Sequence, residues 1–413
     1  MTHYNVVIVG AGHAGVQLAT SLVQGGYAGS IALLSAENVE PYERPPLSKS
    51  YLAGEQSRDD ILFRPSEYWA NSPVDLQLGA IVTSVDPEKR VVTTAAGSAI
   101  HYDYLVWAAG GHARKLSIPG HGLEGVLTIR DLPDVDRLRA LVPTTKHAVV
   151  IGGGYIGLEV AAQLRAWNID VTLVEAQDRL LARVTSPPVS DYYAALHRDR
   201  GVRILLQSQA EQLVGENGKM TTVRLSDGTL LPADLVIVGI GLVPNVGPIA
   251  AAGGQVDNGI VVDEYCQTSL PHVFAIGDLA RHRNEYAGGE YIRLESVQNA
   301  VEQAKVVAHA IMGNRRPYSA VPWFWSNQYD VKLKTVGLLN GYDDYVVRGN
   351  PESGKFSVVY LRNGRVIAID CINTVADFAV GRKLIEQGLE VNVADLKDVS
   401  IPLKSFLAAN SAK

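Results

Sequence analysis

The chain of 413 residues contains few of the residue patterns that mark several common classes of protein. Its two cysteines, Cys266 and Cys371, lie 105 positions apart and form no CxxC pair. A disulfide framework and a zinc site are therefore not expected, and both thiols lie in apolar strand-like surroundings typical of buried cysteine. The histidines lack the spacing of metal ligands, so no metal is predicted, and no Ser-His-Asp pattern stands at a nucleophile turn.

Excess positive charge and long apolar runs are also missing. The net charge is −6, which argues against nucleic-acid binding as the main task. No apolar run reaches the ~18 residues that a membrane span needs. Residues 5–9 form an apolar strand at once, without a basic segment or cleavage site before it, so a cytoplasmic location is expected. The length predicts two to four domains.

Two segments of the chain read alike. Residues 5–15 (NVVIVGAGHAG) and 147–157 (HAVVIGGGYIG) each predict a buried strand, a GxGxxG turn and a helix. Each is followed by a second apolar strand that ends in an acid, Glu37 or Glu175, 22 and 18 residues after the last glycine. A distance of ~20 residues is typical of a dinucleotide site. Glycine turns in an ordinary parallel sheet are the alternative, and the repetition of the whole pattern counts against it.

The three glycines of each copy have distinct tasks. The first makes a tight turn, the second lets the backbone approach a pyrophosphate, and the third lets the helix pack on the strand, while the helix N-terminus holds the phosphate charge. They are Gly10, Gly12 and Gly15 in the first copy and Gly152, Gly154 and Gly157 in the second. Two dinucleotide sites in one chain indicate one bound flavin and one exchanging nicotinamide.

The remaining pattern predicts that the first domain is interrupted by the second. Residues 103–111 and 233–245 each read as a strand that ends in a small-residue crossover, and residues 268–278 as a short strand with a Gly-Asp turn. The fold class is therefore α/β with two Rossmann-type domains, one of residues 1–111 and 247–322 and one of residues 112–246. Residues 323–413 read as an α+β domain, with hairpin signals at Asn340-Gly341 and Asn363-Gly364 and a helix near 377–387 that ends at Gly388.

Several motifs together resemble the NADH-dependent ferredoxin reductases, flavoproteins that feed a 2Fe-2S ferredoxin of an oxygenase system. They are the twin glycine motifs and residues 41–49 (PYERPPLSK), 152–162, 184–190, 268–278 and 322–329 (PWFWSNQY). The resemblance covers essentially the whole chain. It implies a glutathione-reductase-like fold with an FAD-binding domain, an inserted NAD-binding domain and a C-terminal interface domain, and FAD and NADH as cofactors.

The resemblance also implies residue roles. The FAD contacts are Gly10, Gly12, Ala14 and Gly15 at the pyrophosphate, Glu37 at the ribose, Arg44, Pro45 and Lys49 at the flavin, Val82 at the adenine, and Ala109, Arg130, Asp278, Glu295 and Val297. The NADH contacts are Gly152, Gly154, Tyr155, Ile156, Gly157, Glu159, Glu175 at the ribose, Arg183 at the adenine and Gly241, with Trp325 covering the site. Two positions depart from the family: Ala36 stands where an acid is usual, and Ala109 where many relatives carry Thr.

Elementary electrostatics supports three of these roles. Reduced flavin carries negative charge, which a helix N-terminus near residues 295–297 can stabilise. A buried Lys49 needs a carboxylate to stay charged, and Glu159 is the candidate. Together with Trp325, which the resemblance places over the site, they are the expected catalytic residues. The alternatives are a surface lysine at Lys49, a loop acid at Asp278 and a core aromatic at Trp325.

The expected function is the transfer of electrons from NADH through FAD to a 2Fe-2S ferredoxin that serves a haem monooxygenase or a ring dioxygenase. The alternatives are an NADH oxidase, an electron donor to rubredoxin or nitrite reductase, and a non-enzymatic NADH sensor like apoptosis-inducing factor. Residues 41–54 contain no cysteine, which disfavours disulfide reductases and cysteine-dependent oxidases. Residues 305–365 carry a charge of +5 and the remainder −11, so Lys332 and Lys334, with Lys305 and Arg64, are predicted to dock an acidic ferredoxin.

Overall fold

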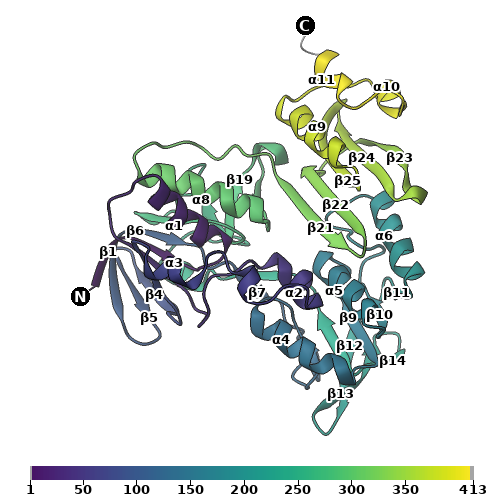
Figure 1. The fold of residues 1–413 in the computed structure, drawn as a ribbon, viewed down its shortest axis with the longest axis horizontal. Helices are drawn as coiled ribbons and strands as arrows, with labels where there is room; N and C mark the ends of the chain where they lie inside the picture. The colour runs from purple at the N-terminus through teal and green to yellow at the C-terminus, as the bar shows by residue number, and fades with distance from the viewer. Residues whose placement is uncertain (1, 410–413) are drawn as a thin grey trace. The chain divides into compact units, whose positions relative to one another are not determined.

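The structure is a computed structural model that describes residues 2–409. The chain divides into two compact units, each assembled from separate stretches of sequence (Figure 1). Unit 1 comprises residues 1–44, 56–112 and 243–322, and unit 2 comprises residues 45–55, 113–242 and 323–413. The chain passes from one unit to the other within β7 (Gly111–Ala113) and β16 (Leu242–Pro244), and at both ends of residues 45–55.

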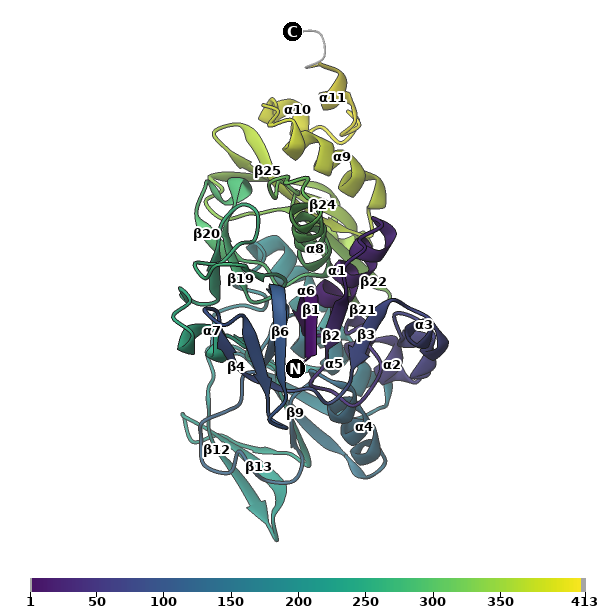
Figure 2. The ribbon, with the colours of Figure 1, turned by 90° about the vertical axis from the view of Figure 1, so that its left-hand side faces the viewer.

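A seven-stranded sheet forms the centre of unit 1, in the order β3-β2-β1-β6-β5-β4 with β18 paired to β6. Its strands are β1 (Thr2–Val9), β2 (Ile31–Leu34), β3 (Val74–Gln77), β4 (Val82–Asp86), β5 (Val91–Thr94), β6 (Ala99–Trp107) and β18 (Val273–Ala275). The five strands β1, β2, β3, β6 and β18 are parallel. Figure 2 shows β1 and β6 side by side at the middle of this sheet.

Both faces of the sheet of unit 1 are covered, which explains the continuous apolar run of β1. Val6 and Ile8 face a core formed with α1 (His13–Gln24) and α8 (Val297–Ile311). Val7 and Val9 face the opposite core. That core includes residues of α7 (Gly247–Ala251) and of a three-stranded sheet of β17 (Ile260–Val262), β19 (Ala280–Arg283) and β20 (Tyr291–Arg293). Short helices complete the unit: η2 (Asp59–Ile61), α3 (Ser66–Ala70) and η4 (Glu285–Ala287).

Unit 2 contains a five-stranded parallel sheet in the order β11-β10-β9-β15-β8. The strands are β8 (Val126–Leu127), β9 (His147–Ile151), β10 (Asp170–Val174), β11 (Arg203–Leu205) and β15 (Leu235–Val238). The helices of this part are α4 (Leu132–Leu141), η3 (Val142–Thr144), α5 (Tyr155–Ala166) and α6 (Pro187–Asp199). A separate antiparallel sheet consists of β12 (Ala210–Glu216), β13 (Lys219–Leu225) and β14 (Leu230–Pro232).

The C-terminal part of unit 2 is an antiparallel sheet in the order β21-β22-β25-β24-β23. Its elements are β21 (Trp323–Gln328), β22 (Val331–Gly337), β23 (Asp344–Asn350), η5 (Pro351–Ser353), β24 (Lys355–Arg362), β25 (Arg365–Ile372), α9 (Val375–Glu386), α10 (Val393–Lys397) and α11 (Ser405–Ala409). One face of the sheet packs on α9, where Gly381 lies against Ile369. On the other face Tyr360 and Ser326 make hydrogen bonds to Ser186 and Glu159, which belong to the part of unit 2 that contains the five-stranded parallel sheet.

Of the two predicted hairpins, both within residues 2–409, the structure contains one and lacks the other. Asn363 and Gly364 both have positive φ, 51° and 76°, and join the paired strands β24 and β25 in a tight turn. The Asn340-Gly341 prediction is wrong, because β22 and β23 are not neighbours in the sheet. Only Gly341 has positive φ there, and the loop carries the chain past two intervening strands.

Candidate functional site

The first glycine turn joins β1 to α1 in unit 1. Gly10 has φ of +110°, and a Cβ there would fall on the carbonyl oxygen of Ala108. A Cβ on Gly15 would fall on the carbonyl oxygen of Gly10, so the third glycine permits the helix to pack on the turn. Gly12, the N-cap of α1, has no atom within 4 Å of its Cβ position. The second glycine therefore borders open space in which another group can approach the backbone.

The second glycine turn joins β9 to α5 in unit 2 and repeats this geometry. Gly152 has φ of +109°, and its Cβ would fall on the carbonyl oxygen of Gly239. A Cβ on Gly157 would fall on Gly152, and Gly154, the N-cap of α5, again borders open space. Neither α1 nor α5 has a side-chain cap or an acid in its first turn. Both helix ends therefore present free backbone N–H groups, and each fits a pyrophosphate.

The two acids after the second strands are both held in place. The Glu175 carboxylate follows β10 directly and accepts the N–H groups of Gly153 at 2.6 Å and Gln177 at 2.7 Å. In unit 1, Glu37 accepts the Tyr42 hydroxyl at 2.5 Å and forms an ion pair with Arg44 at 2.5 Å. Arg44, predicted to line the flavin, therefore lies beside the acid predicted to bind the ribose.

Lys49 and Glu159 meet inside unit 2. The Lys49 Nζ lies 2.6 Å from Glu159 Oε2, and the side chains are 18% and 1% exposed. Ser48 Oγ donates to the same oxygen at 2.5 Å, and Ser326 Oγ donates to Oε1 at 2.6 Å. A buried carboxylate with this number of donors can stay ionised and hold a protonated lysine beside it. Lys49 and Glu159 were predicted from the sequence, but Ser48 and Ser326 were not. The only indication of a role for the two serines was that they lie within the motifs at residues 41–49 and 322–329.

The segment of residues 45–55 belongs to unit 2, whereas the predicted domains place it with the FAD-binding domain. It consists of η1 (Pro45–Ser48) and α2 (Ser50–Ala53). The Tyr51 hydroxyl donates to Asp136 Oδ1 at 2.7 Å, and Arg139 lies over the Tyr51 ring. These contacts with α4, with the Lys49–Glu159 pair, fasten the segment to unit 2. The boundaries of the three predicted domains remain predictions.

Asp278, Glu295 and Val297 lie in unit 1 around a second helix start. Asp278 follows Gly277, which has φ of +84°, after β18. The Arg293 guanidinium donates to the Asp278 carbonyl at 2.7 Å and pairs with Glu295 at 2.6 Å. Val297 is the first residue of α8, whose N-cap Ser296 accepts from the backbone of Asn299. The helix start predicted near residues 295–297 is therefore present, and Glu295 is held by Arg293.

The other predicted NADH contacts lie at the second glycine turn or in loops of unit 2. Ile156 is 43% exposed beside the open Gly154, and Gly241 has φ of +110° with open space around it. Tyr155 begins α5 and packs on Phe324 of β21 with ring centroids 4.6 Å apart, and burial raises the pKa of its hydroxyl well above the usual value. Arg183 is exposed in the loop before α6.

The remaining predicted FAD contacts are divided between the units. Ala14, Val82 and Ala109 lie in unit 1, where the Ala109 carbonyl accepts from Asn245. Pro45 and Arg130 lie in unit 2, and the backbone N–H of Arg130 donates to Asp134 before α4. Trp325 lies in β21, half-buried, with its ring centroid 5.6 Å from that of Trp323. The functional roles of all these residues remain predictions.

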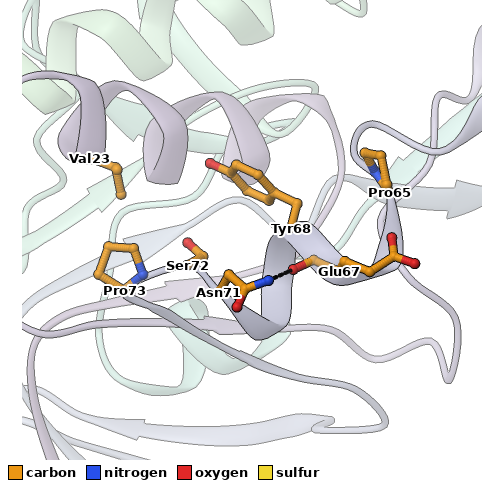
Figure 3. A pocket seen from close by; sticks show the side chains of 7 residues that line it. All are labelled: Val23, Pro65, Glu67, Tyr68, Asn71, Ser72 and Pro73. Carbon is orange, nitrogen blue, oxygen red and sulfur yellow. Dashed lines mark hydrogen bonds between the residues drawn. The ribbon is translucent and has the colours of Figure 1, made fainter.

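Other possible sites carry little chemistry. Cys266 and Cys371 are buried free thiols, and burial raises the pKa of Cys371 to about 12. Within residues 2–409 the structure shows no cluster of three or more potential metal ligands and no helix long and apolar enough to cross a membrane. A surface hollow of about 600 Å³ in unit 1 is lined by Val23, Pro65, Glu67, Tyr68, Asn71, Ser72 and Pro73 (Figure 3). Its lining is largely apolar and includes none of the predicted cofactor contacts.

Comparison with known proteins decides the family. Residues 4–304, with both glycine turns, match the pyridine nucleotide-disulphide oxidoreductase family, and residues 323–407 match the reductase C-terminal family. The chain belongs to the pyridine nucleotide-disulphide oxidoreductase family. The predictions of an α/β fold and of a reductase of this type are confirmed. The chain is an FAD- and NAD(H)-dependent oxidoreductase.

Curated relatives of this oxidoreductase match over nearly their whole length. A ferredoxin–NAD(P)(+) reductase from Sphingomonas sp is 49% identical over 100% of this chain and 99% of its own. The ferredoxin reductase subunit of a 5,5'-dehydrodivanillate O-demethylase from Sphingobium sp. is 49% identical over 99% of this chain and 100% of its own. Putidaredoxin reductase from Pseudomonas putida is 42% identical over 99% of this chain and 98% of its own.

Solved structures give the same result. A chain in the crystal structure of the covalent putidaredoxin reductase–putidaredoxin complex matches with a TM-score of 0.96 and 42% identity, over 100% of this chain and 100% of its own. The ferredoxin reductase for the CYP199A2 system from Rhodopseudomonas palustris matches with a TM-score of 0.94 and 42% identity, over 97% of this chain and 99% of its own. An NAD-dependent persulfide reductase from A. fulgidus, at 22% identity and a TM-score of 0.87, shares the fold.

Proposed function

We propose that this enzyme oxidises NADH and reduces a 2Fe-2S ferredoxin that serves an oxygenase. The balanced reaction is NADH plus two oxidised ferredoxins to NAD⁺, two reduced ferredoxins and one proton. The observation that carries the proposal is the pair of open glycine turns in one chain whose whole length resembles ferredoxin reductases. Bound FAD would supply the change from two-electron to one-electron transfer.

The residues of the chain would bind and orient the two dinucleotides. Gly12 at the start of α1 leaves room for the FAD pyrophosphate, and Gly154 at the start of α5 leaves room for that of NADH. Glu175, fixed by two backbone N–H groups, would accept both hydroxyls of the adenosine ribose. Lys49, held by Glu159, would place a fixed positive charge at the flavin, and Trp325 would cover the nicotinamide.

The identity of the electron acceptor is the part of the proposal for which there are other candidates. Rubredoxin–NAD(+) reductase of Pseudomonas putida is 39% identical over 89% of this chain, so a rubredoxin is the second candidate. Two ferredoxin reductases are 49% identical, over 100% and 99% of this chain. Steady-state turnover with NADH and a 2Fe-2S ferredoxin, a rubredoxin or dioxygen as acceptor tests this choice. We expect the highest kcat/KM with ferredoxin; a higher value with either of the others contradicts the proposal.

The ferredoxin would dock on the face of β21 and β22 that carries Trp325. Lys334 lies directly opposite Trp325, and Lys332 opposite Asn327, so both lysines share this face. Lys332 is exposed, and the Lys334 ammonium lies 5.2 Å from the Phe378 ring centroid. An acidic ferredoxin would be steered by these charges.

The net charge of +5 over residues 305–365 overstates the extent of this basic surface. Arg348 is 7% exposed and donates to backbone carbonyls, Lys305 pairs with Glu302, and Arg365 pairs with Glu390. Lys305 and Arg64 belong to unit 1, so the proposed surface in unit 2 rests on Lys332 and Lys334.

We also propose that the enzyme works in the cytoplasm, where NADH is available and where two unpaired cysteines are ordinary. Cell fractionation with a specific antibody tests this location. Recovery of the protein outside the cytoplasmic fraction contradicts it.

A further inference from the structure

Glu159 stands at one end of a hydrogen-bonded chain that crosses the interior of unit 2. Its carboxylate accepts from Lys49 and Ser48 at Oε2 and from Ser326 at Oε1. Gln328, two residues along β21, donates from Nε2 to Ser326 Oγ at 3.3 Å. Ser326 and Gln328 point to the same side of the strand, toward α5 and α6, because side chains alternate along a strand.

The chain continues to His197 on α6. His197 Nε2 lies 2.9 Å from Gln328 Oε1, and the Tyr329 hydroxyl lies 3.3 Å from His197 Nδ1. His197, Ser326 and Gln328 are each 1% exposed or less. Tyr329 reaches the surface, where Arg200 lies over its ring. The chain therefore joins a buried carboxylate to the protein surface through three fully buried side chains.

In each hydrogen bond of this series, the acceptor is the group nearer to Glu159. The amide oxygen of Gln328 can only accept, so His197 Nε2 carries the hydrogen. Burial lowers the pKa of His197 to about 4, so the ring is neutral and its Nδ1 accepts from Tyr329. Ser326 Oγ has a single hydrogen, accepts from Gln328 and gives its hydrogen to Glu159. Aligned donors of this kind polarise one another and favour negative charge at the accepting end.

We infer that Ser326, Gln328 and His197 are positioning residues for flavin reduction: together they hold Glu159 as a carboxylate, and Glu159 holds Lys49 protonated and in place. The inference rests on the proposed function, since it assigns Lys49 to the flavin. Without these hydrogen bonds, the buried Glu159 carboxylate loses part of the compensation for its desolvation, and the group that holds Lys49 is less firmly placed.

A purely structural role is the alternative, because β21 belongs to the C-terminal sheet and the chain also fastens that sheet to α5 and α6. The dependence of flavin reduction on pH separates the two roles. The ionisable groups around Glu159 are Lys49, Tyr155, Tyr193 and, beyond the tyrosines, Asp370. Burial raises the pKa of both tyrosines, so they do not titrate below pH 9. Asp370 has a pKa of about 6 and needs its own control.

The test is anaerobic stopped-flow reduction of the FAD-loaded enzyme by saturating NADH between pH 5.5 and 9. Ser326→Ala removes one donor to the carboxylate, and we expect the acid limb of its rate profile to move up by about one to two pH units. A shift of this size corresponds to the free energy of one hydrogen bond to a charged group. In Gln328→Met, where Ser326 still donates, the limb should move in the same direction by less. Asn327→Ala, an exposed neighbour on the opposite face of β21, should keep the wild-type profile.

The same measurement in the Asp370→Asn background removes the titration of Asp370, and the shift caused by Ser326→Ala must persist there. Wild-type profiles in FAD-loaded Ser326→Ala and Gln328→Met would overturn the inference, and so would a shift that disappears in the Asp370→Asn background. If Ser326→Ala does not retain FAD, Gln328→Met decides. Failure of the proposed function is distinguishable, since it would appear as a wild-type enzyme that NADH does not reduce.

Discussion

At the scale of single residues, we propose that Glu175 is the group that selects NADH over NADPH. Its carboxylate is oriented by the N–H groups of Gly153 and Gln177 at 2.6 and 2.7 Å. A 2′-phosphate would meet this negative charge and would displace its hydrogen bonds to the ribose. We expect a strong preference for NADH in kcat/KM, and Glu175→Ala should reduce that preference by roughly tenfold or more, the effect of about 1.4 kcal/mol. Equal kcat/KM for NADH and NADPH in the wild-type enzyme would contradict this role.

Lys49 should matter for flavin reduction more than for folding. Its ammonium is fixed 2.6 Å from a buried carboxylate, and Lys49→Met keeps the length of the side chain but removes the charge. We expect slower reduction by NADH, by about tenfold to a hundredfold, with FAD still bound. The matched control is Lys89→Met, at an exposed lysine paired with Asp86. An unchanged reduction rate and flavin potential in Lys49→Met would show that the Lys49–Glu159 pair is only structural.

Asp370 makes the stability of the enzyme depend on pH. It accepts from Thr185 and Tyr360, yet desolvation raises its pKa from 3.8 to about 6. Because the folded state binds this proton more tightly than the unfolded state, the contribution of Asp370 to stability is fully present below pH 4 and is lost as the pH rises through 6. Between pH 4 and pH 7, the free energy of unfolding of Asp370→Asn should rise relative to wild type by on the order of 2–3 kcal/mol. Urea unfolding of both proteins at each pH measures the difference, and a constant difference would contradict the assignment.

At the scale of elements, short-range patterns were predictable from sequence, and so was the long-range Lys49–Glu159 pair, but other long-range contacts were not. The two strand–glycine–helix units could be predicted, because each is one continuous segment in which backbone sterics dictates glycine. The Asn340-Gly341 hairpin prediction failed since the turn signal says nothing of which strands pair. The Ser326–Glu159 contact joins residues 167 positions apart, and a serine in an alternating strand gives no signal of its partner.

The two lysines of β22 give a prediction at the same scale. Lys332 and Lys334 lie on the side of the sheet that bears Trp325. Their double replacement by Glu should raise the KM for ferredoxin about tenfold or more and leave NADH-dependent ferricyanide reduction unchanged. Added salt should slow ferredoxin reduction by the wild-type enzyme, because exposed charges are screened within ~10 Å at ~0.1 M. The control is Lys355→Glu, on β24, compared with the single variant Lys332→Glu, which changes the charge by the same amount. Ferredoxin kinetics insensitive to both salt and the double reversal would place docking elsewhere.

At the scale of the whole molecule, two similar nucleotide-binding folds stand in one chain. The first domain was predicted as residues 1–111 and 247–322, whereas unit 1 consists of residues 1–44, 56–112 and 243–322. The Lys49–Glu159 contact was predicted, but the grouping of residues 45–55 with unit 2 also depends on contacts such as Tyr51 to Asp136, for which the sequence gives no signal. As a result, Lys49, which is assigned to the flavin, lies in the same unit as the proposed NADH site.

The most direct test of the account is a two-step stopped-flow experiment under anaerobic conditions. One equivalent of NADH is mixed with the FAD-loaded enzyme, and the reduced enzyme is then mixed with an excess of oxidised 2Fe-2S ferredoxin. We predict loss of the oxidised flavin absorbance in the first step, and then its full return with two ferredoxins reduced for each NADH. A flavin that NADH does not reduce, or a reduced flavin that the ferredoxin does not reoxidise, would contradict the account.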